Sequence, residues 1–298
     1  MNPMMNSPAK FRRLLAEQQL LVLPGVYNAL FARVMEEIGF PCLYMSGFSV
    51  ATSMLGRPDL GMLGISEMAQ QARLIAAAVD VPLLADADTG YGGVFSIKRT
   101  VEEYEQSGLA GLHIEDQDLL VKRCGWLGDV QVVELPVMLQ RIRSAVRARR
   151  NDDFFIIART DARRCRGFDE ALRRAKAYAD EGADAVFIEY LTDLDEIRRV
   201  VDAVNVPLVT VVIDGPEMIT TDQLKSAGVR ISLLPISVLQ ATVGAARKVG
   251  DALIQQGHTR AVLDRLATPE DLMRYIRYED MCRWERKSES LDQDRDSN

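Results

Sequence analysis

Residues Gly108 to Asp116 read GLAGLHIED, and this short stretch indicates how the chain is built. Gly108 suits the end of a helix, where the residue after the last turn takes a positive φ. The apolar residues after it have the length of a buried parallel strand, and two acids stand at its end. Gly39, Gly182 and Gly228 introduce other apolar runs in the same way. The eight runs are Leu21–Gly25, Cys42–Gly47, Val81–Asp88, Gly111–Asp116, Phe154–Thr160, Ala185–Tyr190, Val206–Ile213 and Val229–Ile236.

These strand-and-helix units follow one another without a linker, which indicates an α/β protein with a parallel sheet. Eight units in about 235 residues suit a closed (β/α)₈ TIM barrel, which typically needs about 250. A doubly wound open sheet is the alternative, but it normally carries a GxGxxG motif after its first strand. Here the first strand leads into LPGVYNAL, from Leu23 to Leu30, which lacks that motif.

Composition narrows the class of protein. The chain has 298 residues and a formal net charge of −7. An acidic pI of about 5.1 argues against nucleic-acid and anionic-membrane partners, which bind positive surfaces. No apolar run reaches the roughly 18 residues that span a bilayer, and the N-terminal residues lack the apolar centre of a signal peptide. Four scattered cysteines suit neither a disulfide framework nor a CxxC metal site, so we expect a cytoplasmic protein.

The segment from Thr268 onward is more polar than the preceding units. Pro269 suits the first turn of a helix, and acidic residues follow it. The predicted segments are a last barrel helix over Val238–Gln256, a tail helix over Glu270–Arg286 within residues 268–287, and a frayed end over Ser288–Asn298. We expect a single domain over residues 1–298, whose tail helix packs against a neighbouring subunit.

Acidic side chains stand where several predicted strands end, which is where the catalytic groups of a TIM barrel lie. Asp86 and Asp88 are two positions apart, so a regular strand turns both toward the same side. Glu115 ends the next strand, and these oxygen ligands without histidine or thiolate suit Mg²⁺ or Mn²⁺. The alternative is a set of water-bridged acids, or an Asp that caps the following helix. Arg159, at the end of the fifth strand, also compensates the charge.

Cys124 follows the fourth strand within KRCG, where two preceding cations favour a thiolate. Gly125 permits a loop that closes over substrate. The simpler alternative for Cys124 is a small buried apolar residue, and we assign that role to Cys42, Cys165 and Cys282. His113 is expected to be a hydrogen-bonded barrel residue and His258 a surface residue, which disfavours a Ser-His-Asp hydrolase.

Seven strings occur in an order that resembles the isocitrate lyase/phosphoenolpyruvate mutase superfamily. They are PGVYNALFARVMEEIGF, YMSG, DADTGYGG, HIEDQ, KRCG, IARTDA and GADAVFIE. The resemblance covers Pro24 to Ser237, and it is greatest to the branch of 2-methylisocitrate lyase, 2,3-dimethylmalate lyase and carboxyphosphonoenolpyruvate mutase. It implies a (β/α)₈ barrel whose last helix is swapped between the subunits of a homodimer or homotetramer.

The resemblance also implies roles for individual residues. The positions that match the family's magnesium-binding acids are Asp86, Asp88 and Glu115. Ser46 and Gly47 match the groups that receive the substrate's α-carboxylate, and Arg159 matches the arginine that holds the reacting end. Tyr44 and Glu189 match residues near the substrate hydroxyl, and Cys124 matches the lyase cysteine. We place Asp86 and Gly125 among the substrate-binding residues as well.

Several positions depart from the pattern of 2-methylisocitrate lyases. Trp126 stands where the lyases usually carry histidine, and Val211 to Ile213 replace Asn-Ile-Thr. Gln240 and approximately Pro269 replace arginines that hold the distal carboxylates of a tricarboxylate. A buried carboxylate without its partner costs several kcal/mol, so these departures favour a smaller or more apolar diacid over 2-methylisocitrate.

The sequence therefore predicts a Mg²⁺-dependent carbon–carbon lyase that splits a substituted 2-hydroxy dicarboxylic acid, such as a 2-alkylmalate or dimethylmalate, into a 2-oxo acid and a carboxylic acid. Decarboxylation or hydrolysis of oxaloacetate is an alternative, as is P–C bond chemistry, because a metal and an enolate serve all of them. A barrel without catalytic activity is the third alternative.

Overall fold

The computed structural model describes residues 7–125 and 129–295, with side chains to residue 288. The chain divides into two compact units, Met1–Leu239 and Gln240–Asn298. The first unit contains all eight predicted strands and the second contains the tail. A single domain over residues 1–298 stays a prediction.

The first unit is a closed barrel of eight parallel strands, in which β1 pairs with β8 and every other strand pairs with its neighbours in the chain. The predicted TIM barrel is confirmed, and the open sheet is wrong. Seven of the predicted runs contain one observed strand each, and β1 extends one residue beyond the remaining run, Leu21–Gly25. The strands are β1 Leu21–Val26, β2 Leu43–Met45, β3 Leu83–Asp86, β4 Gly111–Glu115, β5 Phe155–Thr160, β6 Ala185–Ile188, β7 Leu208–Val211 and β8 Ile231–Leu234.

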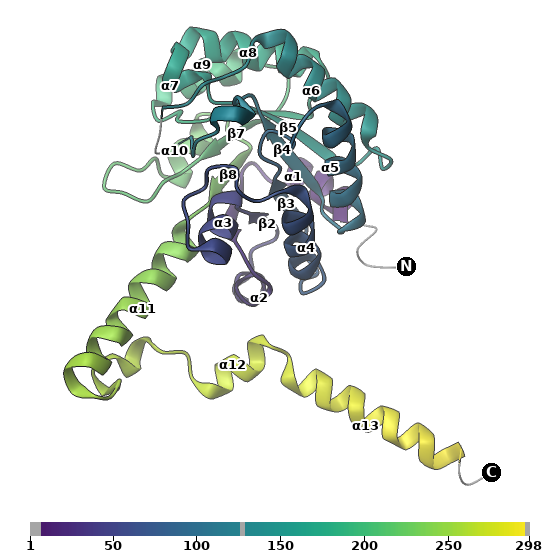
Figure 1. Ribbon diagram of the computed structural model, residues 1–298, viewed down its shortest axis with the longest axis vertical. Helices are drawn as coiled ribbons and strands as arrows, with labels where there is room; N and C mark the ends of the chain where they lie inside the picture. Colours follow the sequence, from purple (N-terminus) through teal and green to yellow (C-terminus); the bar gives the residue numbers. More distant parts are fainter. Residues whose placement is uncertain (1–6, 126–128, 296–298) are drawn as a thin grey trace. The chain divides into compact units, whose positions relative to one another are not determined.

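Helices surround the strands of this unit (Figure 1). Gly108 takes φ 85° after α5, as the opening pattern predicts. Apolar positions on the inner faces of the helices pack against the outward residues of the strands and form the larger core. The elements are α1 Ser7–Glu17, α2 Ala29–Ile38, α3 Gly47–Leu55, α4 Ile65–Ala76, α5 Val94–Gln106, η2 Leu119–Val121, α6 Leu135–Ala148, α7 Ala162–Arg166, α8 Phe168–Asp180, α9 Leu194–Ala203 and α10 Thr221–Ser226.

A second, smaller core fills the inside of the barrel. Alternate residues of each strand point inward, and in β5 they are Phe155, Ile157 and Arg159. Phe11 of α1 is fully buried, and its ring meets Phe155 edge-on at 5.0 Å, at the start of β5. Apolar side chains therefore close the end of the barrel where the strands begin. The polar inward residues, such as Arg159, lie at the other end, where the strands finish.

The tail in the second unit differs from the predicted single helix. One helix was expected over Glu270–Arg286, but the structure has α12 Pro269–Tyr275 and α13 Tyr278–Arg295. The break falls at Arg277, whose φ of 54° cannot continue a right-handed helix. α13 continues past Ser288 to Arg295 and contains no glycine or proline that would stop it. The frayed end over Ser288–Asn298 stays a prediction. Before α12 and α13 lie α11 Ser237–Gln256, which begins in the first unit, and η3 Arg260–Arg265.

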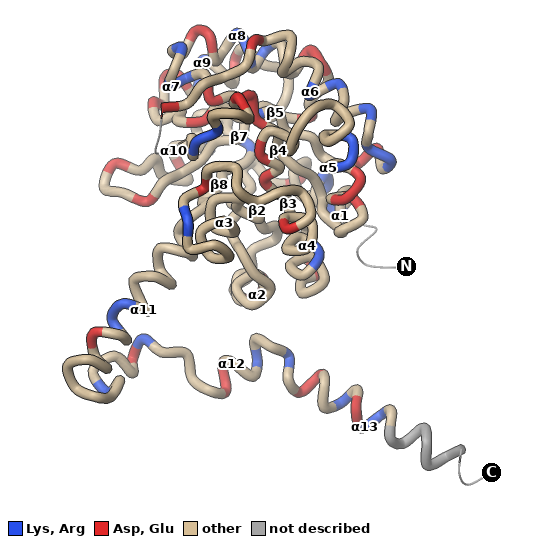
Figure 2. Tube along the Cα trace, in the orientation of Figure 1, with Lys and Arg blue, Asp and Glu red and all other residues tan. Residues whose placement is uncertain are grey.

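Acidic and basic residues are interspersed along the outer helices of the barrel unit (Figure 2). Lys98 pairs with Glu102 within α5, and Arg143 of α6 pairs with Glu181 after α8. Exposed pairs of this kind add about 1 kcal/mol or less each. Among the described helices, none is long and apolar enough to cross a membrane.

Candidate active site

Arg159, near the end of β5, is the centre of a buried charge cluster at the mouth of the barrel. Its Nε and Nη2 donate to the two oxygens of Asp161 at 2.7 and 3.1 Å. Its Nη2 lies 3.3 Å from Glu189, and its Nε lies 3.4 Å from Glu115. The guanidinium also stacks over the ring of Phe187, 5.0 Å from the centroid. Acids from three neighbouring strand ends therefore meet one fixed cation, as the sequence predicts for Glu115, Arg159 and Glu189.

Burial changes the protonation of two of these acids. It raises the pKa of Glu189 to about 7, although Arg159 opposes the shift. It also raises the pKa of Glu115 well above its usual range. The Oε1 atom of Glu115 is buried and accepts no hydrogen bond from the described residues. Glu189 can therefore exchange a proton near neutral pH, and Glu115 presents an oxygen that a further ligand can use.

Tyr44 of β2 faces the same space. Its hydroxyl shares a 2.8 Å hydrogen bond with Nε2 of His113 in β4, which confirms the predicted hydrogen-bonded histidine. Nδ1 of His113 lies 3.7 Å from Asp86, too far for a hydrogen bond. Burial lowers the pKa of His113 to about 4, so the imidazole is neutral at pH 7. The pair positions the Tyr44 hydroxyl below the acids of the mouth.

Ser46 and Gly47 form the start of α3. The Ser46 hydroxyl caps the helix and accepts from the Ser49 amide at 3.2 Å. Gly47 approaches Asp86 so closely that an added Cβ would lie 2.6 Å from Oδ2 of the carboxylate. The amides of a helix N-terminus suit an anion, and the carboxylate-binding role of both residues stays a prediction.

Asp88 reaches the mouth by a route that the sequence did not predict. β3 ends at Asp86, and Asp88 lies beyond it with a φ of 52°, so the alternation of a regular strand does not apply. Its carboxylate is 3.2 Å from Nζ of Lys122, which also bonds both oxygens of Asp59 at 3.0 and 3.1 Å. Burial raises the pKa of Asp88 to about 6. Lys122 and Asp59 are site residues that the sequence analysis missed.

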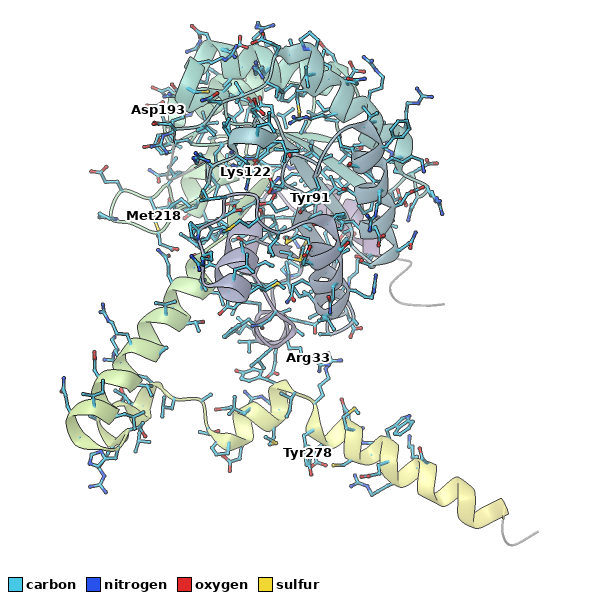
Figure 3. All side chains as sticks on the ribbon, in the orientation of Figure 1. Arg33, Tyr91, Lys122, Asp193, Met218 and Tyr278 are labelled. Atoms are coloured by element: carbon cyan, nitrogen blue, oxygen red, sulfur yellow. The ribbon has the colours of Figure 1, made fainter. Side chains whose placement is uncertain are left out.

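Lys122 is a second cation at the mouth, and it compensates Asp88 and Asp59. Burial disfavours its ammonium, but the surrounding carboxylates, Asp88 first, raise its pKa well above the usual range. Its label stands near the centre of the barrel unit in Figure 3. The KRCG string contains Lys122, but its spacing does not indicate that this lysine reaches Asp88.

The proposed magnesium-binding acids are Asp86, Asp88 and Glu115. Among the residues with described side chains, no three histidine, cysteine or acidic side chains form a ready-made metal cage. The donor set nevertheless fits a hard cation, because all three are carboxylates and Glu115 Oε1 is buried without a partner in the described part. The metal site stays a prediction.

The loop that carries Cys124 lies directly on the Arg159 cluster. Cys124 itself is half-buried. A Cβ on Gly125 would lie 2.6 Å from both Arg159 Nη2 and Asp161 Oδ2, and 3.1 Å from the Cγ of Glu189. Arg164 of α7 donates to the Gly125 carbonyl at 3.3 Å. Gly125 is therefore in contact with the site, whereas Trp126 lies outside the described residues.

The other cysteines have different surroundings. Cys42 is fully buried, and burial raises its thiol pKa, as expected for an apolar core residue. The same prediction for Cys165 is wrong, because this residue is exposed on the short helix α7. Cys282 is half-buried in the second unit.

Three positions predicted to determine substrate size are Val211, Gln240 and Pro269, and each is either apolar or exposed. Val211 ends β7 and packs against the inner core of the barrel. The loop that follows lines a cavity of about 290 Å³, together with Tyr190 and Leu224. Gln240 and Pro269, in the second unit, are exposed. The described ends of β7 and β8 therefore contribute no cation.

Comparison with known proteins places this site in a family. Residues 11–254 match the family described as phosphoenolpyruvate phosphomutase. The chain belongs to the phosphoenolpyruvate phosphomutase family. It is 41% identical to 2-methylisocitrate lyase of Shewanella oneidensis over 271 residues, which cover 90% of this chain and 92% of the relative. It is 36% identical to 2,3-dimethylmalate lyase of Eubacterium barkeri, covering 89% and 92%.

Solved structures show the same relationship. Oxaloacetate acetylhydrolase bound to 3,3-difluorooxalacetate superposes with a TM-score of 0.90 at 36% identity, over 95% of this chain and 97% of that one. Phosphonopyruvate hydrolase bound to oxalate and Mg²⁺ superposes with a TM-score of 0.82 at 30% identity, over 92% and 96%. The predicted superfamily is confirmed, and the chain is a family enzyme whose relatives support the carbon–carbon lyase class.

Proposed function

We propose that this family member is a Mg²⁺-dependent lyase that cleaves a substituted 2-hydroxy dicarboxylate into a 2-oxo acid, such as pyruvate, and a carboxylic acid. The observation that carries the proposal is the Arg159 cluster under Gly125. A fixed guanidinium, an acid with a pKa of about 7 and the loop of Cys124 meet at one place.

The residues of the cluster suit the two proton transfers of such a cleavage. Glu189 takes the proton of the substrate hydroxyl as the bond between C2 and C3 breaks and C2 becomes the carbonyl carbon. The bonding electron pair goes to C3, and the Cys124 thiol supplies the proton that converts this carbanion into the departing carboxylic acid. Arg159 stays charged and holds the carboxylate of the 2-oxo acid.

The predicted magnesium ligands are Asp86, Asp88 and Glu115. Bound there, Mg²⁺ would supply a Lewis acid for the oxygen that becomes the carbonyl of the 2-oxo acid. The protein contributes a buried set of carboxylates, and Lys122 compensates the charge of Asp88. The Mg²⁺ complex of phosphonopyruvate hydrolase supports this assignment within the superfamily.

The substrate class follows from the charge at the mouth. Relatives' names favour 2-methylisocitrate, a tricarboxylate, and also include 2,3-dimethylmalate, a dicarboxylate. Val211 and the end of β8 bring no cation to their side of the barrel, and each unpaired buried carboxylate costs several kcal/mol. The proposal therefore favours the dicarboxylate.

The test measures pyruvate release in an assay coupled to lactate dehydrogenase. The panel contains 2,3-dimethylmalate, 2-methylmalate and 2-methylisocitrate, each with Mg²⁺, because cleavage beside the hydroxyl-bearing carbon of each compound releases pyruvate. The highest kcat/KM is expected for a 2-alkylmalate or dimethylmalate. A preference for 2-methylisocitrate would overturn the substrate class but not the reaction.

Cleavage of oxaloacetate is the second candidate, because the oxaloacetate acetylhydrolase structure superposes with a TM-score of 0.90. That activity releases oxalate and acetate instead of pyruvate. Chromatography of products from oxaloacetate separates the two candidates in one experiment. Oxalate formation that exceeds every alkylmalate turnover would replace the lyase proposal.

We also propose that the chain forms a homodimer or homotetramer through a swapped C-terminal helix. The support is a set of apolar side chains on α12, on α13 and in the link between them, whose exposure to water is unfavourable. They are Leu272, Met273, Ile276, Met281 and Trp284. Light scattering of the full chain measures its mass, and Trp284→Glu with Ile276→Glu is expected to reduce the assembly. A monomeric wild type would refute this assembly.

A further inference from the structure

Asp116, the residue after the end of β4, has no role in the proton transfers described above. It is fully buried, and its carboxylate contacts residues of β5 and α8. We propose that Asp116 is a positioning residue that holds the guanidinium of Arg159 in place for carboxylate binding. The inference deepens the proposed function and rests on the role given there to Arg159.

Asp116 bonds to each of three consecutive residues at the end of β5. Its backbone N–H donates to the carbonyl of Arg159 at 3.2 Å. Its Oδ2 accepts from the Thr160 hydroxyl at 2.6 Å, and its Oδ1 accepts from the Asp161 amide at 2.9 Å. One side chain and its own amide therefore fix the local backbone on both sides of Thr160.

Asp116 affects the position of Arg159 through Asp161. The carboxylate of Asp161 forms two parallel hydrogen bonds with the guanidinium, at 2.7 and 3.1 Å, and such a paired arrangement fixes direction as well as distance. The Asp161 carboxylate also accepts from the side-chain amide of Gln117. Because Asp116 sets the backbone from which Asp161 extends, it determines where this pair points.

The partners of Asp116 on α8 indicate a role in geometry more than in stability. Arg174 is fully buried and donates from Nη1 to Oδ2 of Asp116 at 2.9 Å, and the Tyr178 hydroxyl donates to the same atom at 2.7 Å. Nη2 of Arg174 is buried without a partner among the described residues, which costs stability. Buried ion pairs are weak evidence for stabilisation, so the network is better explained by the position it imposes.

The test compares Asp116→Asn with a matched control. The side-chain amide of the variant keeps one oxygen that can accept hydrogen bonds. Its NH₂ group cannot accept the hydrogen bonds that Thr160, Arg174 and Tyr178 donate to Oδ2 of Asp116. The control is Asp184→Asn, because Asp184 also accepts from two arginines, Arg12 and Arg149, and from the backbone amide of Ile156 in β5. Asp184 contacts the beginning of β5, whereas Arg159 lies near the end of that strand.

The readout is the affinity for oxalate in the presence of Mg²⁺, measured by calorimetry, together with Tm. Hydrogen-bond partners behind metal ligands typically contribute 10- to 100-fold. We expect an effect of the same order behind Arg159, so Asp116→Asn should raise the oxalate Kd about tenfold. The control is expected to change it by about twofold or less while lowering Tm. Tyr178→Phe keeps the ring packing and is expected to raise the Kd about two- to fivefold.

An unchanged oxalate Kd in both Asp116→Asn and Tyr178→Phe would overturn the inference, and so would an equal loss in Asp184→Asn. If Asp116→Asn does not fold, Tyr178→Phe decides alone. A wild type that does not bind oxalate also refutes the inference, since Arg159 then clamps no carboxylate. If oxalate affinity falls as expected but no substrate is cleaved, the positioning role stands and only the lyase proposal fails.

Discussion

Replacing Gly125 with alanine should separate the loop of Cys124 from the cluster that it covers. The new Cβ would lie 2.6 Å from Arg159 Nη2 and Asp161 Oδ2, whereas ordinary contacts begin at 3.4 Å. Something must therefore move by about 0.8 Å. Arg159 and Asp161 hold each other through two hydrogen bonds, so the loop moves instead.

That displacement shifts Cys124, the proposed proton donor, away from the reacting carbon. A misplacement of about 1 Å can cost about 100-fold in rate, and we expect kcat of Gly125→Ala to fall by this order in the pyruvate assay. Tm is expected to stay close to the wild-type value, because the displaced segment belongs to a loop. Gly250→Ala in α11 is the control, since a Cβ there meets nothing within 4 Å.

The outcome tests the contact directly. A wild-type kcat in Gly125→Ala would refute the reasoning, because the loop would then not need its close approach to Arg159. A loss of oxalate affinity that equals the loss of kcat would show that the guanidinium moved and that the loop stayed.

Three further predictions follow from the site. Chelation of Mg²⁺ by EDTA should abolish cleavage and excess Mg²⁺ should restore it; activity that survives EDTA would refute the metal site. Cys124→Ser should lower kcat by about 10²- to 10⁴-fold with little change in oxalate Kd, and full activity would exclude the thiol as proton donor. Glu189 has a folded pKa of about 7 against an ordinary 4.5, so its burial costs stability that grows as pH rises between these values. Glu189→Gln should therefore raise Tm, relative to wild type, more at pH 8 than at pH 5, and an equal effect at both pH values would contradict the buried carboxylate.

The barrel could be predicted because its information is local. A helix-ending glycine and a short apolar run occupy adjacent positions, as at Gly108, and each unit repeats them. The break at Arg277 could not be predicted in the same way. Nothing in the residues between Pro269 and Arg286 forbids a continuous helix, and a positive φ at an arginine is set by contacts that the pattern does not contain.

The candidate site likewise contains residues that the sequence predicts and residues that it does not. Glu115, Arg159 and Glu189 stand at strand ends, so topology alone brings them together. Lys122 and Asp59 are 63 positions apart and come from loops, whose course no periodicity describes. Asp88 shows the limit most clearly, because its spacing from Asp86 suggested a strand although the strand had already ended.

The site combines side chains at the strand ends, here called the wall, with side chains from loops. This combination also explains why the names of the relatives indicate the class of reaction more clearly than the substrate. The wall holds Arg159 and its acids through contacts made within and behind the strands. The loop residues are tied to that wall, with Lys122 on Asp88, the Arg123 amide on Gln117 at 3.0 Å, and the Gly125 carbonyl on Arg164. Under the proposed function, a change of substrate requires changes around this shared centre, at positions such as Val211. Relatives named for methylisocitrate, dimethylmalate and oxaloacetate are similar to this chain over most of its length, and we propose that the groups facing the far end of the substrate distinguish their substrates.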